Sequence, residues 1–386
     1  MSFSVSEVRY LWANAGAIAA AEAGLGLTGK SAFADRALLQ ERFGDHSRAV
    51  LELATARRGA AGKFPGWWLA DGDASQQATP ARVAAVRAAR LRGHGVEMVH
   101  DVTCSVGSEA PAALAAGMGW LGSDLDPARL LMARHNLGPD AWLARADALA
   151  PASTARHDSA VVADPARRAN GRRITDPAKL HPPLPALLEA HRGRELAVKC
   201  APGIDYSEWE GLVSVVSVGG AVKEACLYTP GLAGGVAREA VVLGEGEERV
   251  TSSDPAEVEV TGPRAFIIEP DGAIVRAGLV RHWAHRHNLS MLDEHIAFLT
   301  GDALPPGISG FPFLESVPLK KLRPALAAHR AGAAEILVRG VDVDPDELRR
   351  KLKLKGPEHR GVVIARVGAG AVAHICGPRQ RGQAHG

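Results

Sequence analysis

The chain has 386 residues, of which 46% are hydrophobic and 23% are charged. This composition is typical of a soluble globular protein, and the length exceeds what one core usually serves, so we expect two or three domains. The 45 Lys and Arg residues barely outnumber the 43 Asp and Glu residues. The resulting net charge of +2 excludes a protein that binds polyanions through its overall charge, so any nucleic-acid binding must come from local basic patches.

The cysteines and the one uncharged stretch indicate a compartment. Cys104, Cys200, Cys226 and Cys376 lie far apart without a C-x-x-C pair, which argues against a zinc site and favours a reducing cytoplasm. Residues 10–21 carry no charge but are too short to cross a membrane and lack a basic flank, so they are predicted to form a buried helix. We therefore expect a cytoplasmic protein without a membrane anchor.

Residues 1–90 are predicted to form an N-terminal helical region. Apolar residues recur at helical spacings between residues 36 and 57, with a break near residue 44 that predicts two helices. Farther along, Thr79 and Pro80 favour a helix start, with the threonine hydroxyl capping free amides and the proline at the first helical position.

Strands and helices alternate from residue 97 onward, which is typical of a doubly wound, Rossmann-like α/β fold. Predicted strands cover residues 97–100, 118–124, 141–144, 159–163 and 196–199, and a hairpin at 212–228 adds two antiparallel strands. In such a sheet, ligands bind outside the carboxyl ends of the strands, so the residues that follow each strand are candidate site residues.

Three of these strand ends carry recognisable chemistry. The turn DVTCSVGSEA, residues 101–110, consists mainly of small residues that let a ligand approach the backbone. Asp124, at the end of the second strand, is placed to accept hydrogen bonds from two ribose hydroxyls, whereas Asp126, in front of Pro127, is placed to cap the next helix. A small polar ligand is therefore expected at this edge of the sheet.

The motifs in this order resemble class I S-adenosylmethionine-dependent methyltransferases, in particular the trimethylguanosine-synthase-like and THUMP-containing RNA methyltransferases. Residues 101–107 are similar to the D-x-x-C-G-x-G sequence of these enzymes, with Ser105 in place of the first glycine. Residues 124–136, DLDPARLLMARHN, resemble their D-I-D-P-x-x-x-x-x-A-R-x-N motif. Residues 199–205, KCAPGID, look like the K-x-x-P-G-[IL]-D loop of one bacterial group. The resemblance implies S-adenosylmethionine as the cofactor.

The resemblance also implies which residues contact the cofactor. Asp124 would bind the ribose, Asp147 would meet the adenine amino group, and the segment that begins at Thr79 would fold over the methionine end. The positions that match the motifs are Thr79, Asp101, Thr103, Cys104, Gly107, Asp124, Leu125, Asp147 and Ala148.

The segment after the fourth strand resembles the family's D/N-P-P-[YFW] motif, which lies beside the methyl donor. Asp164 and Pro165 match its start and are the predicted catalytic residues, while Ala166 and Arg167 replace the second proline and the aromatic residue. An acid here would accept a hydrogen from the methyl acceptor and orient its lone pair. The arginines that follow favour contact with a substrate phosphate over a purely solvated loop: Arg167, Arg168, Arg172 and Arg173.

Residues 236–310 are predicted to be an extension and linker without a metal site. Four histidines in this segment lack the spacing of zinc ligands, so they are expected to form the polar face of a helix that also carries Asp293 and Glu294: His282, His285, His287 and His295.

Residues 311–386 resemble the THUMP-like domain that follows a methyltransferase domain in some bacterial proteins, and the relatives of this domain are RNA-binding modules. A local excess of basic residues is expected to contact RNA phosphates, including Lys320, Lys321, Arg339, Lys351 and Lys353. Acidic residues are interspersed among them, so the alternative is a helix surface that lysines keep soluble.

The order of the motifs favours a methyltransferase domain at 91–235 that acts on a nucleotide in structured RNA, with RNA as the partner. A small-molecule methyltransferase is the first alternative, which the modest net charge favours. The second is an RNA-binding protein with a degenerate cofactor pocket, motivated by Ser105 and the missing aromatic residue. The sequence does not predict an oligomeric state.

Overall fold

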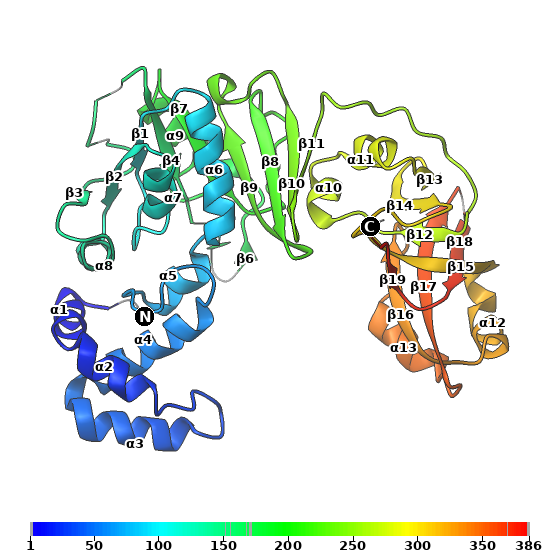
Figure 1. The fold of residues 1–386 in the computed structure, drawn as a ribbon, viewed down its shortest axis with the longest axis horizontal. Helices are drawn as coiled ribbons and strands as arrows, with labels where there is room; N and C mark the ends of the chain where they lie inside the picture. The colour runs from blue at the N-terminus through cyan, green and yellow to red at the C-terminus, as the bar shows by residue number, and fades with distance from the viewer. Residues whose placement is uncertain are drawn as a thin grey trace. The chain divides into compact units, whose positions relative to one another are not determined.

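The computed structural model describes residues 3–150, 152–154, 156–166, 168–169, 172–368 and 370–383; for 168–169 and 172–173 it describes the backbone alone. The chain divides into two compact units, Met1–Ala237 and Arg238–Gly386 (Figure 1). The first unit contains a group of helices and a mostly parallel sheet, and the second contains an eight-stranded sheet. These features confirm the predicted α/β fold class.

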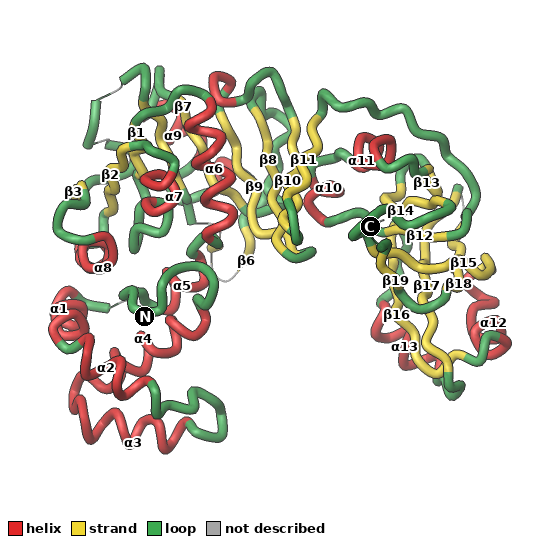
Figure 2. Tube along the Cα trace, in the orientation of Figure 1, coloured by secondary structure: helices red, strands yellow, loops and turns green. Residues whose placement is uncertain are grey.

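Helices form the start of the first unit (Figure 2). They are α1 (Val5–Ala13), α2 (Ala15–Glu22), α3 (Ala32–Phe43), α4 (Ser47–Gly59) and the short α5 (Gly72–Gln77). A 3₁₀ turn at Gly44–His46 separates α3 from α4, as the break near residue 44 predicted. Buried residues of these helices share one core with Ala128 and Met132 of α8 (Pro127–Leu137), so the helical group packs against the sheet-bearing part of the unit.

The prediction of one buried helix over residues 10–21 is wrong. Asn14 ends α1, where its backbone and side-chain NH groups both donate to the carbonyl oxygen of Tyr10, and α2 begins at the next residue. Leu11 and Ile18 are buried, but Trp12 is 40% exposed. The uncharged stretch therefore spans the end of one helix and most of a second, and it is only partly buried.

The sheet of the first unit follows the predicted strands closely. Its strands are β1 (Met98–Asp101), β2 (Gly119–Asp124), β3 (Trp142–Arg145), β4 (Ser159–Ala163), β7 (Glu195–Cys200), β8 (Leu212–Val218) and β9 (Ala221–Tyr228). They lie in the order β8-β9-β7-β4-β1-β2-β3, and only β8 and β9 introduce antiparallel pairs. The helices α6 (Ala81–Gly93), α7 (Ala110–Ala115) and α9 (Leu184–Ala190) alternate with these strands along the chain.

The strand order places a switch point between β1 and β4. From β1 the chain builds outward through β2 and β3, and it then returns to place β4 on the opposite side of β1. Two neighbouring crossovers therefore diverge at the carboxyl ends of β1 and β4, which leaves a crevice in a sheet of this kind. Asp101 ends β1 and Asp164 directly follows β4, so both candidate site residues lie at this switch point.

The second unit begins with a hairpin of β10 (Arg238–Leu243) and β11 (Glu247–Thr251). Its eight-stranded sheet has the order β13-β14-β12-β15-β18-β17-β16, with β19 paired to β15. The strands are β12 (Phe266–Ile268), β13 (Ser290–Asp293), β14 (Ile296–Gly301), β15 (Ser309–Pro318), β16 (Ala331–Arg339), β17 (Glu358–Val367), β18 (Gly370–Cys376) and β19 (Gln380–Arg381). The helices are α10 (Gly272–Arg276), α11 (Val280–Arg286), α12 (Leu322–Ala328) and α13 (Pro345–Leu352).

Both faces of this second sheet are covered. Along β17, Val362 and Ile364 belong to a core with residues of α12 and α13, so these two helices lie on the same face. Val363 and Ala365 alternate with them and belong to a second core that includes Phe298. The period of two places successive side chains on opposite faces, which explains the continuous apolar run in β17.

The prediction of a helix containing Asp293, Glu294 and His295 is wrong. These residues form the turn between β13 and β14, where an Asp293 carboxylate oxygen accepts a hydrogen bond from the His295 amide at 2.9 Å. Such a side-chain turn competes with a helix. His282 and His285 lie on α11 instead.

No metal-binding group of three or more His, Cys, Asp or Glu side chains occurs in the part of the chain that the structure describes. Within the same residues, no helix combines the length and the apolar character needed to cross a membrane.

We predict that Gly122→Ala destabilises the first unit. A Cβ atom at Gly122, in the middle of β2, would lie 2.2 Å from the Trp120 ring and 2.9 Å from the Cys104 sulfur. Overpacking of this kind costs about 1–3 kcal/mol of the free energy of unfolding, measurable by denaturant titration. Gly16→Ala is the matched control, because a Cβ atom there meets nothing within 4 Å and α2 gains from the added alanine. Equal stability of Gly122→Ala and the natural protein would contradict the prediction.

Candidate functional site

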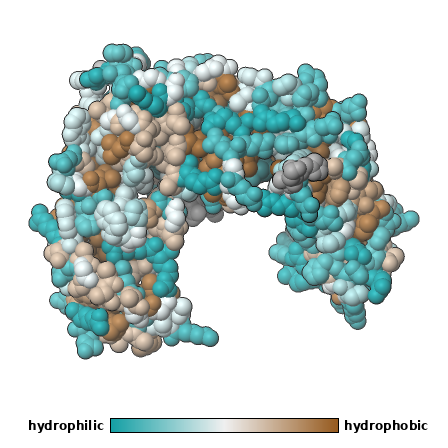
Figure 3. Space-filling model, in the orientation of Figure 1, coloured by the Kyte–Doolittle hydropathy of each residue, from teal (hydrophilic) through white to brown (hydrophobic). Residues whose placement is uncertain are grey.

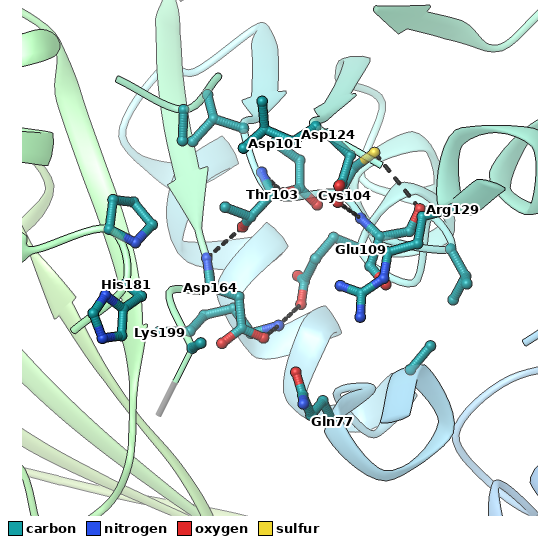
Figure 4. Close-up of a pocket in the computed structure, with 18 of the residues that line it drawn as sticks. Gln77, Asp101, Thr103, Cys104, Glu109, Asp124, Arg129, Asp164, His181 and Lys199 are labelled. Carbon is teal, nitrogen blue, oxygen red and sulfur yellow. Dashed lines mark hydrogen bonds and ion pairs between the residues drawn. The ribbon is translucent and has the colours of Figure 1, made fainter. Parts of the chain in front are cut away.

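A cavity of about 440 Å³ lies in the first unit at the carboxyl ends of the parallel strands (Figure 4). Its wall includes Asp101 at the end of β1, Thr103 just after it, Asp124 at the end of β2, Asp147 after β3 and Asp164 after β4. Asp124 and Asp164 therefore open into the same space. The segment around α5 adds three further lining residues, Ala74, Gln77 and Ala78.

The turn after β1 forms the floor beside α7. Ser105 and Gly107 both have positive φ angles, +50° and +86°, so the chain reverses tightly over four residues. A Cβ atom at Gly107 would lie 2.7 Å from the Leu137 side chain, which adds a steric reason for glycine at this position. Ser105 adopts a left-handed conformation, which glycine would adopt with less strain, and its amide donates to an Asp124 carboxylate oxygen at 2.9 Å.

Asp124 is held in place by the backbone. One carboxylate oxygen accepts from the Ser105 amide, and the other accepts from the Asp126 amide at 3.0 Å. Each oxygen retains a further lone pair, so the side chain can still accept hydrogen bonds from a ligand. Asp126 caps α8, as predicted, because its carboxylate accepts from the Ala128 amide at 2.8 Å.

Residues after β3 and at the start of α8 also line the cavity. The Asp147 carboxylate accepts from the Leu149 amide at 2.9 Å, and the Ala148 carbonyl oxygen lies 2.8 Å from the ring nitrogen Nε2 of buried His191. Arg129 also lines the cavity, and its Nε is buried without a hydrogen-bond partner among the described residues. A buried donor of this kind fits a ligand that brings an acceptor.

Lys199 and Glu109 line the cavity (Figure 4), and with the buried Arg87 and Glu224 they form a chain of ion pairs. Lys199, at the end of β7, places its Nζ 2.8 Å from an Asp164 carboxylate oxygen and 3.0 Å from a Glu109 oxygen. Arg87 of α6 donates through Nε and Nη2 to both Glu109 oxygens at 3.1 Å. Its Nη1 donates to Glu224 of β9 at 2.5 Å.

Burial and neighbouring charges shift the pKa values of this group in opposite directions. Burial, reinforced by the charges of Glu109 and Asp164, raises the pKa of Asp101 from 3.8 to about 8 against the opposing effect of Lys199. Burial alone would raise the pKa of Glu109 as well, but Arg87 and Lys199 hold it well below its usual range. Burial opposes the charge of Lys199, yet the Asp164 and Glu109 carboxylates raise its pKa. Asp101 is therefore protonated at neutral pH, whereas Glu109 and Lys199 stay charged.

Most of the predicted cofactor residues lie together at this cavity. The predicted residues that line it are Asp101, Thr103, Cys104, Asp124, Leu125, Asp147, Ala148 and Asp164. Gly107 shapes the turn between two lining residues, Val106 and Ser108, and Pro165 is buried beside Asp164.

Thr79 does not belong to the lining residues, and the prediction that it caps a helix is wrong. Pro80 occupies the N-cap position of α6, and no side chain caps that helix. The Thr79 hydroxyl donates instead to Glu224 at 3.4 Å, because the buried carboxylate lies beside it.

The basic residues predicted for the substrate have different positions. Arg167 lies outside the described residues, as do the side chains of Arg168, Arg172 and Arg173, whose backbones form the short strands β5 (Arg168–Ala169) and β6 (Arg172–Arg173). In the second unit, Arg339 donates to Glu269 at 3.0 Å and lies over the Phe298 ring. Arg339 is thus engaged in contacts within its unit.

Sequence reasoning assigned no role to Arg87, Glu109, Lys199 or Glu224. Lys199 begins the KCAPGID motif, which was a signal for its position but not for its contacts. The partners of Arg87 lie 22 and 137 residues away in the chain, so no local pattern could have linked them.

Comparisons with known proteins agree with this geometry. The chain is 47% identical over 356 residues to two uncharacterized S-adenosylmethionine-dependent methyltransferases of Mycobacterium tuberculosis, from strains CDC 1551 / Oshkosh and H37Rv. The alignments cover 87% of this chain and 98% of each relative. The chain belongs to the S-adenosylmethionine-dependent methyltransferases. S-Adenosylmethionine is therefore the cofactor.

The fold and the C-terminal part of the methyltransferase have relatives of their own. A crystal structure described as a methyltransferase from Porphyromonas gingivalis W83 matches with a TM-score of 0.63 at 17% identity, covering 86% of this chain and 90% of that one. This match concerns the fold alone. Residues 309–378 match the family described as THUMP domain-like.

The cavity of the methyltransferase fits its cofactor. It falls within the range of 300–1,000 Å³ usual for small-molecule sites, and a fixed carboxylate at the end of β2 suits a pair of ribose hydroxyls. The glycine-containing turn allows close approach to the backbone, and Arg129 Nε, which makes no hydrogen bond among the described residues and lies 4.0 Å from the Asp126 carboxylate, supplies a donor.

We predict that Asp101→Asn stabilises the methyltransferase increasingly as pH rises. The folded protein keeps the Asp101 proton up to about pH 8, whereas the unfolded chain loses it near 3.8, so ionisation favours the unfolded state between these values. Relative to the natural protein, the variant should gain up to about 1.4 kcal/mol of unfolding free energy per pH unit below pH 8. Denaturant titrations at pH 5, 6, 7 and 8 measure the difference, and a constant difference across this range would refute the prediction.

Proposed function

We propose that the methyltransferase transfers a methyl group to a nucleotide in structured RNA. The observation that carries this proposal is the presence, in one chain, of the cofactor cavity and a THUMP-like segment at residues 309–378. Domains of the latter kind have RNA-binding relatives, as the sequence resemblance implied. The net charge of +2 does not attract RNA by itself, so the proposal depends on local surfaces.

Residues at different strand ends would bind different parts of the cofactor. Asp124 would accept from the ribose hydroxyls, and Asp147 would accept from the adenine amino group. The turn at residues 103–108 would approach the amino-acid part of the cofactor through its backbone. The bound cofactor supplies an electrophilic methyl carbon on a sulfonium sulfur, so the protein needs to align this carbon with the acceptor atom.

Asp164 would orient the methyl acceptor. Its carboxylate lines the cavity, and its backbone NH donates to the Thr103 hydroxyl at 2.6 Å, which ties the end of β4 to the turn after β1. A carboxylate paired with Lys199 is a weak base, so we expect it to accept a hydrogen bond from an amino or hydroxyl group more readily than a complete proton. The lone pair of the acceptor atom is then directed toward the methyl carbon.

The RNA surface would lie on the helical face of the second sheet. Lys351 on α13 and Lys353 at its C-terminal end are exposed, as are Lys320 and Lys321 in front of α12. Figure 3 shows a hydrophilic surface over α13. Lys351 pairs with Glu347 at 2.6 Å, but a surface pair of this kind contributes little stability and leaves the ammonium available to a phosphate.

We predict that Asp124→Asn weakens S-adenosylmethionine binding about 10- to 100-fold, because hydrogen bonds to a charged acceptor contribute about 1.5–3 kcal/mol. Isothermal calorimetry measures the change. Asp126→Asn is the matched control, since asparagine is as good an N-cap as aspartate and should leave affinity unchanged. Equal affinities of Asp124→Asn and the natural protein would remove Asp124 from the site.

We predict that the purified protein methylates RNA extracted from cells that lack its gene. Radiolabelled S-adenosylmethionine reports the transfer, and mass spectrometry of nucleosides identifies the product, which should be missing from those cells. Label in small molecules alone would support the small-molecule alternative. Absence of both cofactor binding and transfer would support the degenerate pocket.

The lysines test the placement of the RNA surface in the same assay. The double variant Lys351→Ala, Lys353→Ala should retain its affinity for the cofactor but should retain less RNA in a filter-binding assay. The magnitude of the slope of the logarithm of the RNA-binding constant against the logarithm of the salt concentration should fall by up to about two. Lys30→Ala, at an exposed lysine of the first unit, is the control and should leave RNA retention unchanged. Unchanged retention by the double variant would place the RNA surface elsewhere.

A further inference from the structure

Lys199 connects the proposed catalytic carboxylate of Asp164 to Glu109 and, through Glu109, to Arg87 (Figure 4 shows the contacts of Lys199). We propose that Lys199 is a positioning residue for methyl transfer, which holds the Asp164 carboxylate ionised and in one orientation toward the methyl acceptor. Glu109 and Arg87 in turn hold Lys199. This inference rests on the role proposed above for Asp164.

The contacts of Lys199 leave it little freedom. Its side chain is 3% exposed, and its ammonium contacts carboxylate oxygens of two residues at once, Asp164 at 2.8 Å and Glu109 at 3.0 Å. The Asp164 side chain is 21% exposed and lines the cavity, as do Lys199 and Glu109, whose side chains are only 3% and 7% exposed. Lys199 is thus almost fully buried at the cavity wall, where it holds the more exposed Asp164 carboxylate.

Arg87 makes the support rigid. Its planar guanidinium donates through two nitrogens to the two Glu109 oxygens and through the third to Glu224. Such a fork fixes both the position and the plane of the Glu109 carboxylate. Glu109 therefore presents one oxygen to Lys199 in a single geometry, and Lys199 in turn holds the Asp164 carboxylate.

The backbone of Asp164 is fixed independently of its side chain. Its amide donates to Thr103 after β1, while its carboxylate pairs with Lys199 on β7. Asp164 is thus held from both neighbouring strands of β4. A merely structural ion pair would not need a carboxylate that also lines the cofactor cavity.

The proposed role is compatible with the chemistry of methyl transfer. The acceptor atom forms a bond to the methyl carbon while the carbon–sulfur bond breaks, and the sulfur keeps that electron pair. The acceptor carries its hydrogen into this step, hydrogen-bonded to Asp164, and the proton then passes to solvent. To orient the methyl acceptor in this way, the Asp164 carboxylate must be ionised and immobile. Protonation of Asp164 would remove the negative charge that accepts this hydrogen bond, so the rate of methyl transfer should fall on the acidic side of the pH profile.

Several charged groups act on Asp164 or on its partner Lys199, and the test must separate the contribution of Lys199 from the contributions of the others. They come from α6, β1, the start of α7, β7 and β9: Arg87, Asp101, Glu109, Lys199 and Glu224. Lys199 contacts the Asp164 carboxylate directly, at 2.8 Å.

The experiment compares Lys199→Met, Lys199→Arg and Glu109→Gln in the full-length protein. Carbon-13 NMR of labelled aspartate follows the Asp164 carboxyl group, which Asp164→Asn assigns, and methyl transfer into RNA gives the pH profile. Loss of the ammonium in Lys199→Met should move both the titration midpoint and the acidic limb to higher pH by about one unit or more, and Lys199→Arg should restore them. Glu109→Gln should move them to lower pH, because Glu109 no longer competes for the ammonium.

The outcomes are distinguishable. A uniform loss of rate with an unmoved midpoint in Lys199→Met would make Lys199 structural and overturn the inference. If Lys199→Met does not fold, an unmoved or raised midpoint in Glu109→Gln overturns it equally. If the natural protein does not methylate RNA, the proposed function fails, while the NMR midpoints still decide the role of Lys199. Lys30→Met, at an exposed lysine, is the control and should change neither measurement.

Discussion

The buried ion pairs among Arg87, Glu109, Lys199 and Glu224 are the constraint on which the cofactor site depends. They join α6, α7, β7 and β9, and through Asp164 they reach the end of β4. Burying these charges is costly, and removing one partner leaves another charge unpaired in the interior, which costs about 3–5 kcal/mol. The wall of the cavity therefore forms as a unit, and the carboxylates at its surface have defined positions before any ligand arrives.

The strand ends of the first unit could be predicted because their signals are local. Short apolar runs ended at Asp101, Asp124 and Ala163, and each was followed by turn residues, so the parallel sheet and the cavity residues around Asp124 and Asp164 followed from the order of motifs. The supporting ion pairs could not be predicted. Their members come from separate helices and strands, and charge alone does not distinguish a buried pair from a solvated one.

Two of the wrong predictions, the Thr79 cap and the helix at residues 293–295, have a common physical cause. Thr79 has the local chemistry of a helix cap, but a buried carboxylate on another element takes its hydroxyl. Residues 290–301 have mixed polar and apolar periodicity, and the pairing of β13 with β14 decides in favour of strands. In both cases a tertiary contact outweighs a propensity that is worth only a fraction of a kcal/mol per residue.

The strand order of the second unit has a consequence for any attempt to isolate the THUMP-like segment. β12 lies between β14 and β15, and Phe298 from β14 shares a core with Val363 from β17. A fragment beginning near residue 309 would leave β15 with an unpaired edge and an uncovered apolar face, and exposed edges of this kind promote aggregation. The smallest fragment suitable for separate expression therefore begins before β12, well upstream of residue 309, where the match to the THUMP domain-like family begins.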